Sequence, residues 1–254
     1  MLLTSPLSPT DFQTFFILTM IYFITLCFLD GYFAIRILQQ RRKTQATKFG
    51  FVHSIVVLFL LLIISRLIYI YFDFNLTKFD PDTYYREPNI WFWKIGGLVS
   101  NIGYAVLLFV TDYRVFKFKF KGFFAFLLVG TSLVQLFYPV TDSQSFEVAS
   151  NIDLVANIVA IVLPVFFFYI GRKKSPVRMP SLAVAFGVII YAIGSNIQNE
   201  GFLAVVIPAF GLGARIPIYF ISLILLISGI VMFSYGLTRF ANVFSSASQK
   251  PKED

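Results

Sequence analysis

The sequence predicts an all-α integral membrane protein of seven transmembrane helices, with the N-terminus outside and the C-terminus inside. The first observation is composition: 57% of the residues are hydrophobic and 13% charged, with a mean hydropathy of +0.78, whereas a soluble domain is nearer half apolar and a quarter charged. The 32 phenylalanines are more than a soluble core of this size could hide. Long apolar runs and an uneven distribution of basic residues are the other two observations. Together they predict a multi-pass protein of the cell membrane, with the lipid bilayer as its first partner.

The seven spans are predicted from apolar runs, because crossing a hydrocarbon core of about 30 Å takes roughly 20 residues. The predicted spans are residues 12–38, 49–73, 92–112, 122–139, 152–171, 180–197 and 216–238. The chain then divides into an extracellular N-terminus over 1–11, a seven-helix bundle over 12–238 and a short cytoplasmic tail over 239–254. Residues 202–211, FLAVVIPAFG, are apolar but too short to span. We expect this segment at the outer interface, near the mouth of the bundle.

Lysines and arginines decide the predicted orientation, because cytoplasmic loops carry an excess of them. With the N-terminus outside, 16 of the 21 basic residues fall on the inner side and 4 on the outer side, while Arg66 lies within a span. The odd number of spans and this asymmetry agree on a cytoplasmic C-terminus.

The stretch YRVFKFKFKGFF, residues 113–124, alternates basic and aromatic residues as a two-faced β-strand would. Its position between the third and fourth spans instead makes it a cytoplasmic turn. We expect Arg114, Lys117, Lys119 and Lys121 to face anionic headgroups while the phenylalanines dip into the interface. No nucleic-acid partner is expected, and binding of a cytoplasmic partner at this loop stays open.

Polar residues within the predicted spans gather at mid to outer depth, each cluster largely on one face of its helix. If those faces point inward, they line a polar, aromatic cavity that opens to the outside and would suit a flat or anionic small molecule or a lipid. The candidate ligand-binding residues are Arg66, Tyr69, Asn101, Tyr104, Gln135, Asp153, Asn157, Tyr191 and Tyr219. The alternative is that these side chains only form hydrogen bonds between helices and hold the bundle together.

Two groups of ionisable residues are predicted to need partners inside the membrane. Exposing Arg66 to acyl chains would cost at least ~2.5–3.5 kcal/mol, so we expect it to face the interior, with Asp153, Asn157 or Asp73 as acceptor. It would be either a structural ion pair or a ligand anchor. On the inner side Asp30 and His53 lie at comparable depth, where a contact between them would be either a proton-sensitive polar switch or a lock between two helices.

An enzyme is not predicted. Intramembrane catalysis needs paired carboxylates, a histidine cluster or an activated nucleophile, and the chain has one histidine and one cysteine. A single cysteine excludes an intrachain disulfide, and one cysteine with one histidine is too few for a Cys/His metal cluster. The last predicted span contains no lysine to hold retinal as a Schiff base. We therefore expect no cofactor.

The stretch GRKKSPVRMPSLAVAFGVIIYAIGSNI, residues 171–197, joins a basic turn to a glycine-punctuated helix. With the seven-helix, N-out plan it resembles the membrane sensor regions N-terminal to many archaeal histidine kinases. That resemblance implies a receptor-like sensor of an external or membrane-borne signal, with signalling through a cytoplasmic partner because no kinase domain is present. A small transporter or channel is the alternative, which a three-helix repeat or a helix broken at Pro164 would favour.

Overall fold

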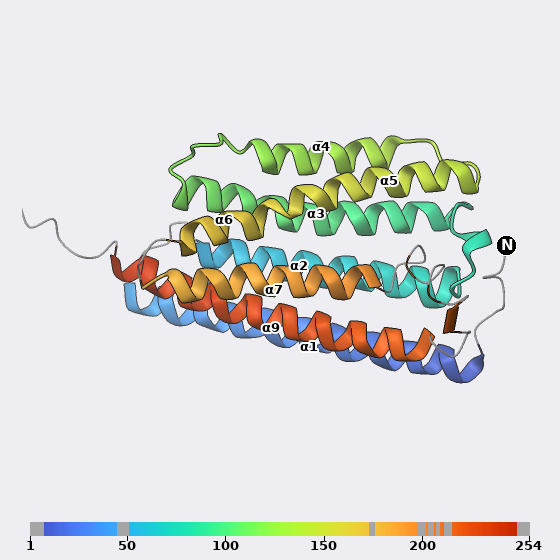
Figure 1. Cartoon of the computed structure of the whole chain (residues 1–254), viewed down its shortest axis with the longest axis horizontal. Helices are drawn as coiled ribbons and strands as arrows, with labels where there is room; N and C mark the ends of the chain where they lie inside the picture. Colours follow the sequence, from blue (N-terminus) through green and yellow to red (C-terminus); the bar gives the residue numbers. More distant parts are fainter. Residues whose placement is uncertain are drawn as a thin grey trace, which may run out of the picture. The chain divides into compact units, whose positions relative to one another are not determined.

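The computed structural model describes residues 8–44, 51–172, 176–197, 202, 206, 209, 210 and 215–247, and these parts are helical with no strand (Figure 1). The predicted all-α class is confirmed. The chain forms two compact units, Met1–Ala160 and Ile161–Asp254, here called unit 1 and unit 2.

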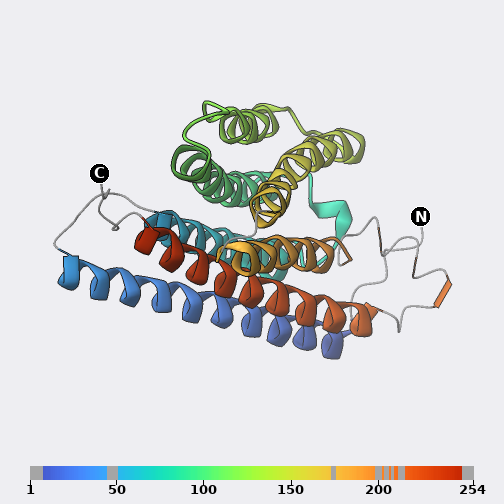
Figure 2. The ribbon, with the colours of Figure 1, turned by 60° about the vertical axis from the view of Figure 1, so that its left-hand side comes forward.

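Unit 1 is a series of helices in which each one packs against the next along the chain (Figures 1 and 2). Its helices are α1 (Pro9–Thr44), α2 (Phe51–Ile70), α3 (Asn89–Val115), α4 (Phe123–Phe137) and α5 (Ser143–Ala160). A π-helical turn, η1 (Tyr71–Leu76), extends α2, and a short 3₁₀ turn, η2 (Pro81–Thr83), precedes α3. The long pairs α1–α2 and α2–α3 are therefore antiparallel hairpins.

Local sequence accounts for two of the helix starts. At α1 the backbone N–H of Asp11 donates to Ser8 Oγ at 3.1 Å, and Pro9 occupies the first helical position, which needs no N–H partner. The helix thus begins at Pro9, slightly before the predicted span at residue 12. At α5 the carboxylate of Asp142 accepts the backbone N–H of Ser145 at 2.7 Å, which makes Asp142 an N-cap.

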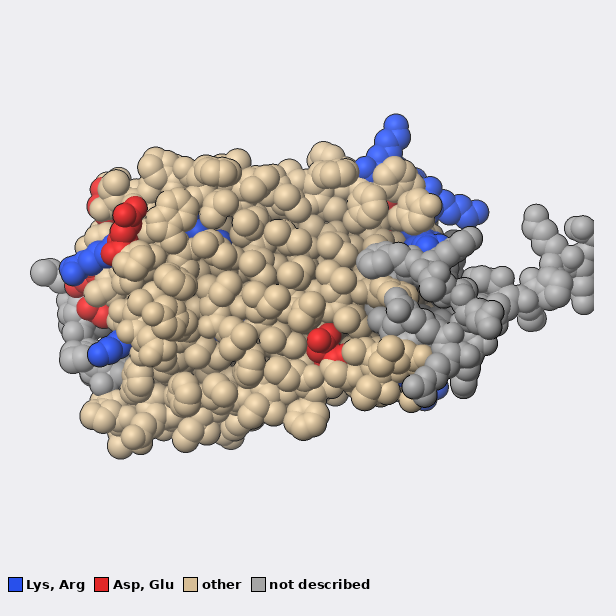
Figure 3. Space-filling model, turned by 180° about the vertical axis from the view of Figure 1, so that it is seen from behind, with Lys and Arg blue, Asp and Glu red and all other residues tan. Residues whose placement is uncertain are grey.

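Five segments are long and apolar enough to cross a membrane. They are Pro9–Arg36, His53–Thr77, Asn89–Val115, Arg178–Ile197 and Arg215–Phe240. On the face seen in Figure 3, most of the surface carries no Lys, Arg, Asp or Glu, as expected of helices that lie in lipid.

The other two predicted spans correspond to shorter apolar helices. The 15 residues of α4 rise about 22 Å at ~1.5 Å per residue, which is less than a ~30 Å hydrocarbon core. The predicted span 152–171 is divided between α5, which ends at Ala160, and α6 (Val162–Gly171). Pro164 explains the break, because it has no N–H to donate to the carbonyl of Ala160 four residues earlier.

Unit 2 holds α6, α7 (Arg178–Ile197) and α9 (Arg215–Ala247), with α7 packed along α9. Glycines bring the backbones of α7 and α9 together. A Cβ built on Gly187 would collide with the backbone nitrogen of Phe233 and lie 2.8 Å from the carbonyl oxygen of Gly229. Farther along, Ser222 Oγ donates to the carbonyl oxygen of Gly194 at 2.7 Å.

Candidate functional site

Arg66 is the intramembrane cation of α2, and its partners belong to α1. Its Nη2 donates to Thr19 Oγ1 at the long distance of 3.5 Å, and its guanidinium carbon lies 5.4 Å from the ring centroid of Tyr22. Its Nε is buried and has no hydrogen-bond partner among the described residues. We call these three residues the Arg66 site. It joins a full positive charge to a hydroxyl and an aromatic face, both of them neutral.

Of the three acceptors predicted for Arg66, only Asp73 has a side chain among the described residues. Asp73 lies in η1 and forms no ion pair with Arg66 among the described residues. Asp153 and Asn157 lie on α5, and their side chains are outside the described residues. A cation–π contact and one long hydrogen bond compensate a guanidinium only in part.

Tyr69, one turn after Arg66, lies where α2 and α3 come close. Its ring occupies the space above Gly96, where a built Cβ would come within 3.1 Å of a Tyr69 ring carbon. In the same contact Ser65 Oγ donates to the carbonyl oxygen of Gly96 at 2.8 Å. These contacts join neighbouring helices, which was the alternative to a cavity wall.

One of the candidate residues of α3 forms a hydrogen bond that joins α3 to α4. Asn101 Nδ2 donates to Ser132 Oγ at 2.9 Å, and both side chains are buried. Ser132 in turn donates to the carbonyl oxygen of Leu128 at 2.8 Å. Gln135 is buried one turn farther on α4, whereas Tyr104 of α3 is half-buried. Asn101 thus serves packing in this structure.

The remaining candidates belong to unit 2. Tyr191 of α7 is half-buried, and its backbone nitrogen lies where a Cβ on Gly229 would collide. Tyr219 of α9 is also half-buried. The candidate residues therefore fall into two groups, one on each unit. Of the segment 202–211 most residues lie outside the described parts, as does its place at the mouth of a cavity.

The predicted polar pair on the inner side consists of Asp30 and His53. Among the described residues no hydrogen bond links Asp30 of α1 to His53 of α2, and Asp30 Oδ1 is buried without a hydrogen-bond partner. Asp30 and His53 lie on neighbouring helices of the α1–α2 hairpin.

The basic and aromatic stretch between α3 and α4 is a series of turns centred on Asp112. The buried Asp112 carboxylate accepts the backbone N–H of Phe120 at 3.1 Å and that of Gly122 at 2.8 Å. Its backbone carbonyl accepts the N–H of Phe118 at 2.9 Å. Lys117, Phe118 and Lys121 all have positive φ, so the strand-like alternation does not produce a strand. The sequence signal for a turn here was Gly122, which adopts a positive φ of 73°.

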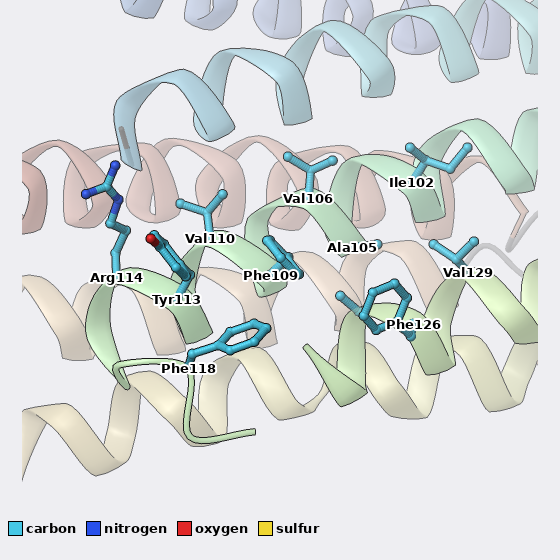
Figure 4. A pocket seen from close by; sticks show the side chains of 11 residues that line it. Ile102, Ala105, Val106, Phe109, Val110, Tyr113, Arg114, Phe118, Phe126 and Val129 are labelled. Atoms are coloured by element: carbon cyan, nitrogen blue, oxygen red, sulfur yellow. The ribbon is translucent and has the colours of Figure 1, made fainter. Parts of the chain in front are cut away.

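A groove that sequence reasoning did not find lies beside this turn, between α3 and α4 (Figure 4). Its volume is about 790 Å³. Its walls are apolar except at one end, where Tyr113 and Arg114 lie. Phe118, carried by the positive-φ turn, lies 5.7 Å from Phe109 between ring centroids and lines the same end.

No family model, curated protein or solved structure matches the chain. Functional inference therefore depends on the residues themselves.

Proposed function

We propose that this protein is a receptor-like membrane sensor of seven crossings, with its N-terminus outside and its C-terminus inside, that recognises an anionic amphiphile at the Arg66 site. The observation that supports this is that the guanidinium of Arg66, within the span His53–Thr77, has only neutral partners among the described residues. Arginines in such segments are costly and are typically retained for function.

The anionic character of the ligand follows from the partners of Arg66. Thr19 and Tyr22 supply a hydroxyl oxygen and a ring face, and neither carries charge. A carboxylate or phosphate could accept from the guanidinium in two parallel hydrogen bonds, including one from the buried Nε. The apolar surroundings of α1 and α2 favour a ligand whose remainder is hydrocarbon.

Signalling would pass to a cytoplasmic partner, as in the sensor regions that the chain resembles. Ligand bound at Arg66 touches α1 and α2 together, so it would favour one packing of that hairpin over another. The basic inner loops are the surface to which such a partner would bind.

The test compares a matched pair of probes on the purified protein in detergent. We expect oleate to raise the melting temperature and oleyl alcohol, which has the same chain without the charge, to raise it much less. Arg66→Gln should abolish the difference between the probes, and Arg66→Lys should keep part of it. Arg86→Gln removes an exposed arginine of the predicted outer loop and is the control. An equal oleate effect in wild type and Arg66→Gln would refute the site.

A small transporter is the second candidate, favoured by the break between α5 and α6. Interrupted helices in transporters place backbone groups at a central binding site, and the chain interrupts its fifth predicted span at Ile161, before Pro164. In a Cys27→Ser background, a cysteine at Ile161, which is 56% exposed, can be probed with a membrane-impermeant maleimide. Labelling from both sides of the membrane would favour the transporter, and labelling from one side only would favour the sensor.

A further inference from the structure

The groove between α3 and α4 has one polar end. Ile102 and Val129 line the end away from the turn, and Tyr113 and Arg114 line the end beside it (Figure 4). Phe126 is 67% exposed and Tyr113 55% exposed, so the walls of the groove reach the molecular surface. A ligand that fits must therefore be a hydrocarbon with a polar group at one end.

The length of the groove matches one leaflet of a membrane. From Ile102 to Arg114 the axis of α3 rises about 18 Å at ~1.5 Å per residue. Half of a ~30 Å hydrocarbon core is about 15 Å. An acyl chain lying from Arg114 to Ile102 would thus run from the headgroup region to the middle of the bilayer.

The charge at the polar end selects the headgroup. Arg114 carries a permanent positive charge, and Lys117, Lys119 and Lys121 are exposed on the adjoining turn. The two backbone N–H bonds to Asp112 hold that turn, and Phe118 of the same turn lines the groove. Four cations beside an apolar groove complement a phosphate that carries a net negative charge.

We propose that the α3–α4 groove binds one molecule of an anionic phospholipid from the leaflet at this end of the helices. One acyl chain lies against Val106, Phe109 and Phe126, and the phosphate is held by Arg114 with the lysines of the turn. This site is separate from the Arg66 site and does not depend on it.

The experiment measures lipid retention by native mass spectrometry after reconstitution in nanodiscs that contain equal amounts of phosphatidylglycerol and phosphatidylcholine with identical acyl chains. We expect wild type to retain one phosphatidylglycerol in preference to phosphatidylcholine. Arg114→Gln should reduce that preference at least tenfold, and Arg114→Lys should preserve most of it. Val106→Trp, which fills the groove, should reduce retention of both lipids.

Matched controls come from α9. Arg239 lies over Tyr235 at 5.6 Å much as Arg114 lies over Tyr113 at 5.5 Å, so Arg239→Gln removes the same kind of pair without touching the groove. Val231→Trp adds the same bulk at a position that is 46% exposed. Both controls should retain phosphatidylglycerol as wild type does.

Several results would overturn the proposal. They are equal retention of the two lipids by wild type, a preference unchanged by Arg114→Gln, and a loss that Arg239→Gln reproduces. Retention of glycerol phosphate without acyl chains would assign the site to a soluble anion instead. Arg66→Gln should leave the preference intact, so failure of the sensor proposal and failure of this one are distinguishable.

Discussion

Substituting Gly187 by alanine tests the close contact between α7 and α9. The new Cβ would point into α9, where it would collide with the backbone nitrogen of Phe233 and lie 2.8 Å from the carbonyl oxygen of Gly229. Because both obstacles are backbone atoms, no side chain can rotate away to make room. The two helices must separate or bend.

The expected cost follows from that geometry. Ordinary contact between heavy atoms is about 3.5–4.0 Å, so α7 and α9 must part by at least ~0.7 Å at this crossing. Overpacking of this kind costs about 1–3 kcal/mol, while alanine regains up to ~1 kcal/mol of helix propensity. Since the obstacles are rigid, we expect a net loss of about 2 kcal/mol. At ~2–4 °C per kcal/mol this lowers the melting temperature by roughly 4–8 °C.

The same substitution should have the opposite sign elsewhere. A Cβ on Gly31 of α1 or on Gly130 of α4 meets nothing within 4 Å. There only the propensity gain remains, so Gly31→Ala and Gly130→Ala should stabilise by up to ~1 kcal/mol. Gly96→Ala, where the neighbour is the Tyr69 ring at 3.1 Å, should fall between these cases because a side chain can shift.

The assay must report on unit 2. Both tryptophans, Trp91 and Trp93, lie in α3 of unit 1, so their fluorescence follows the wrong unit. Thermal melts followed by circular dichroism, with hydrogen exchange of peptides from α7 and α9, give the needed signal. If Gly187→Ala were as stable as wild type, or if Gly130→Ala destabilised as much, the close contact of α7 and α9 would be refuted.

Three further outcomes test unit 1. Lys94→Met should destabilise by about 1–2 kcal/mol in thermal melts, because Lys94 Nζ donates to the carbonyl of Tyr138 at 2.6 Å at the C-terminal end of α4; an unchanged melt would contradict this. Asp112→Asn leaves one carbonyl oxygen for two N–H donors, so trypsin should cut the α3–α4 turn faster than in wild type, and equal cleavage would show that the carboxylate does not hold the turn. Hydrogen bonds from the backbone N–H of Ser145 and then from its hydroxyl lower the pKa of Asp142 below its usual 3.8. The stabilisation of the α5 N-terminus by the ionised Asp142 carboxylate is therefore fully present above pH 3.8 and is lost as the pH falls through the lowered pKa. After correction for the intrinsic pH dependence of amide exchange, protection of the amides at the start of α5 should therefore fall on acidification in wild type and not in Asp142→Asn. Identical protection profiles in the two proteins would exclude this cap.

The membrane helices could be predicted from sequence because their cause is local. Apolar composition over some twenty residues is enough to specify a span, and the five long spans lie within a few residues of the predicted ones. The α3–α4 turn was harder to predict from the sequence, because alternating Lys and Phe residues have the period of two that is typical of a strand. Its turns depend on the buried Asp112, whose hydrogen bonds reach residues eight and ten positions away.

The α7–α9 contact was visible in the sequence but not recognised. Gly187 and Gly194 are seven residues apart, as are Gly229 and Gly236, so each pair falls on one face of its helix. Which partner such a face meets depends on tertiary structure, and the sequence alone does not select it. For the same reason the sequence did not decide whether Asn101 lines a cavity or joins two helices. The structure shows its Nδ2 2.9 Å from Ser132 Oγ, so it joins α3 to α4.

The way these helices are joined also indicates where function should be sought. Apolar side chains give little preference for a neighbouring helix over lipid, because acyl chains are equally apolar. Glycine contacts and hydrogen bonds such as Asn101–Ser132 and Ser65–Gly96 therefore supply the specificity of packing. Polar groups that hold helices together in this way already have their hydrogen-bond partners. Arg66, whose described partners are the neutral Thr19 and Tyr22, and Arg114, which lines the polar end of an apolar groove, are the cations on which the two proposals depend. Under both proposals a negatively charged, hydrocarbon-bearing ligand would bind at these arginines, so they are the positions where lipid-like anions should be sought first.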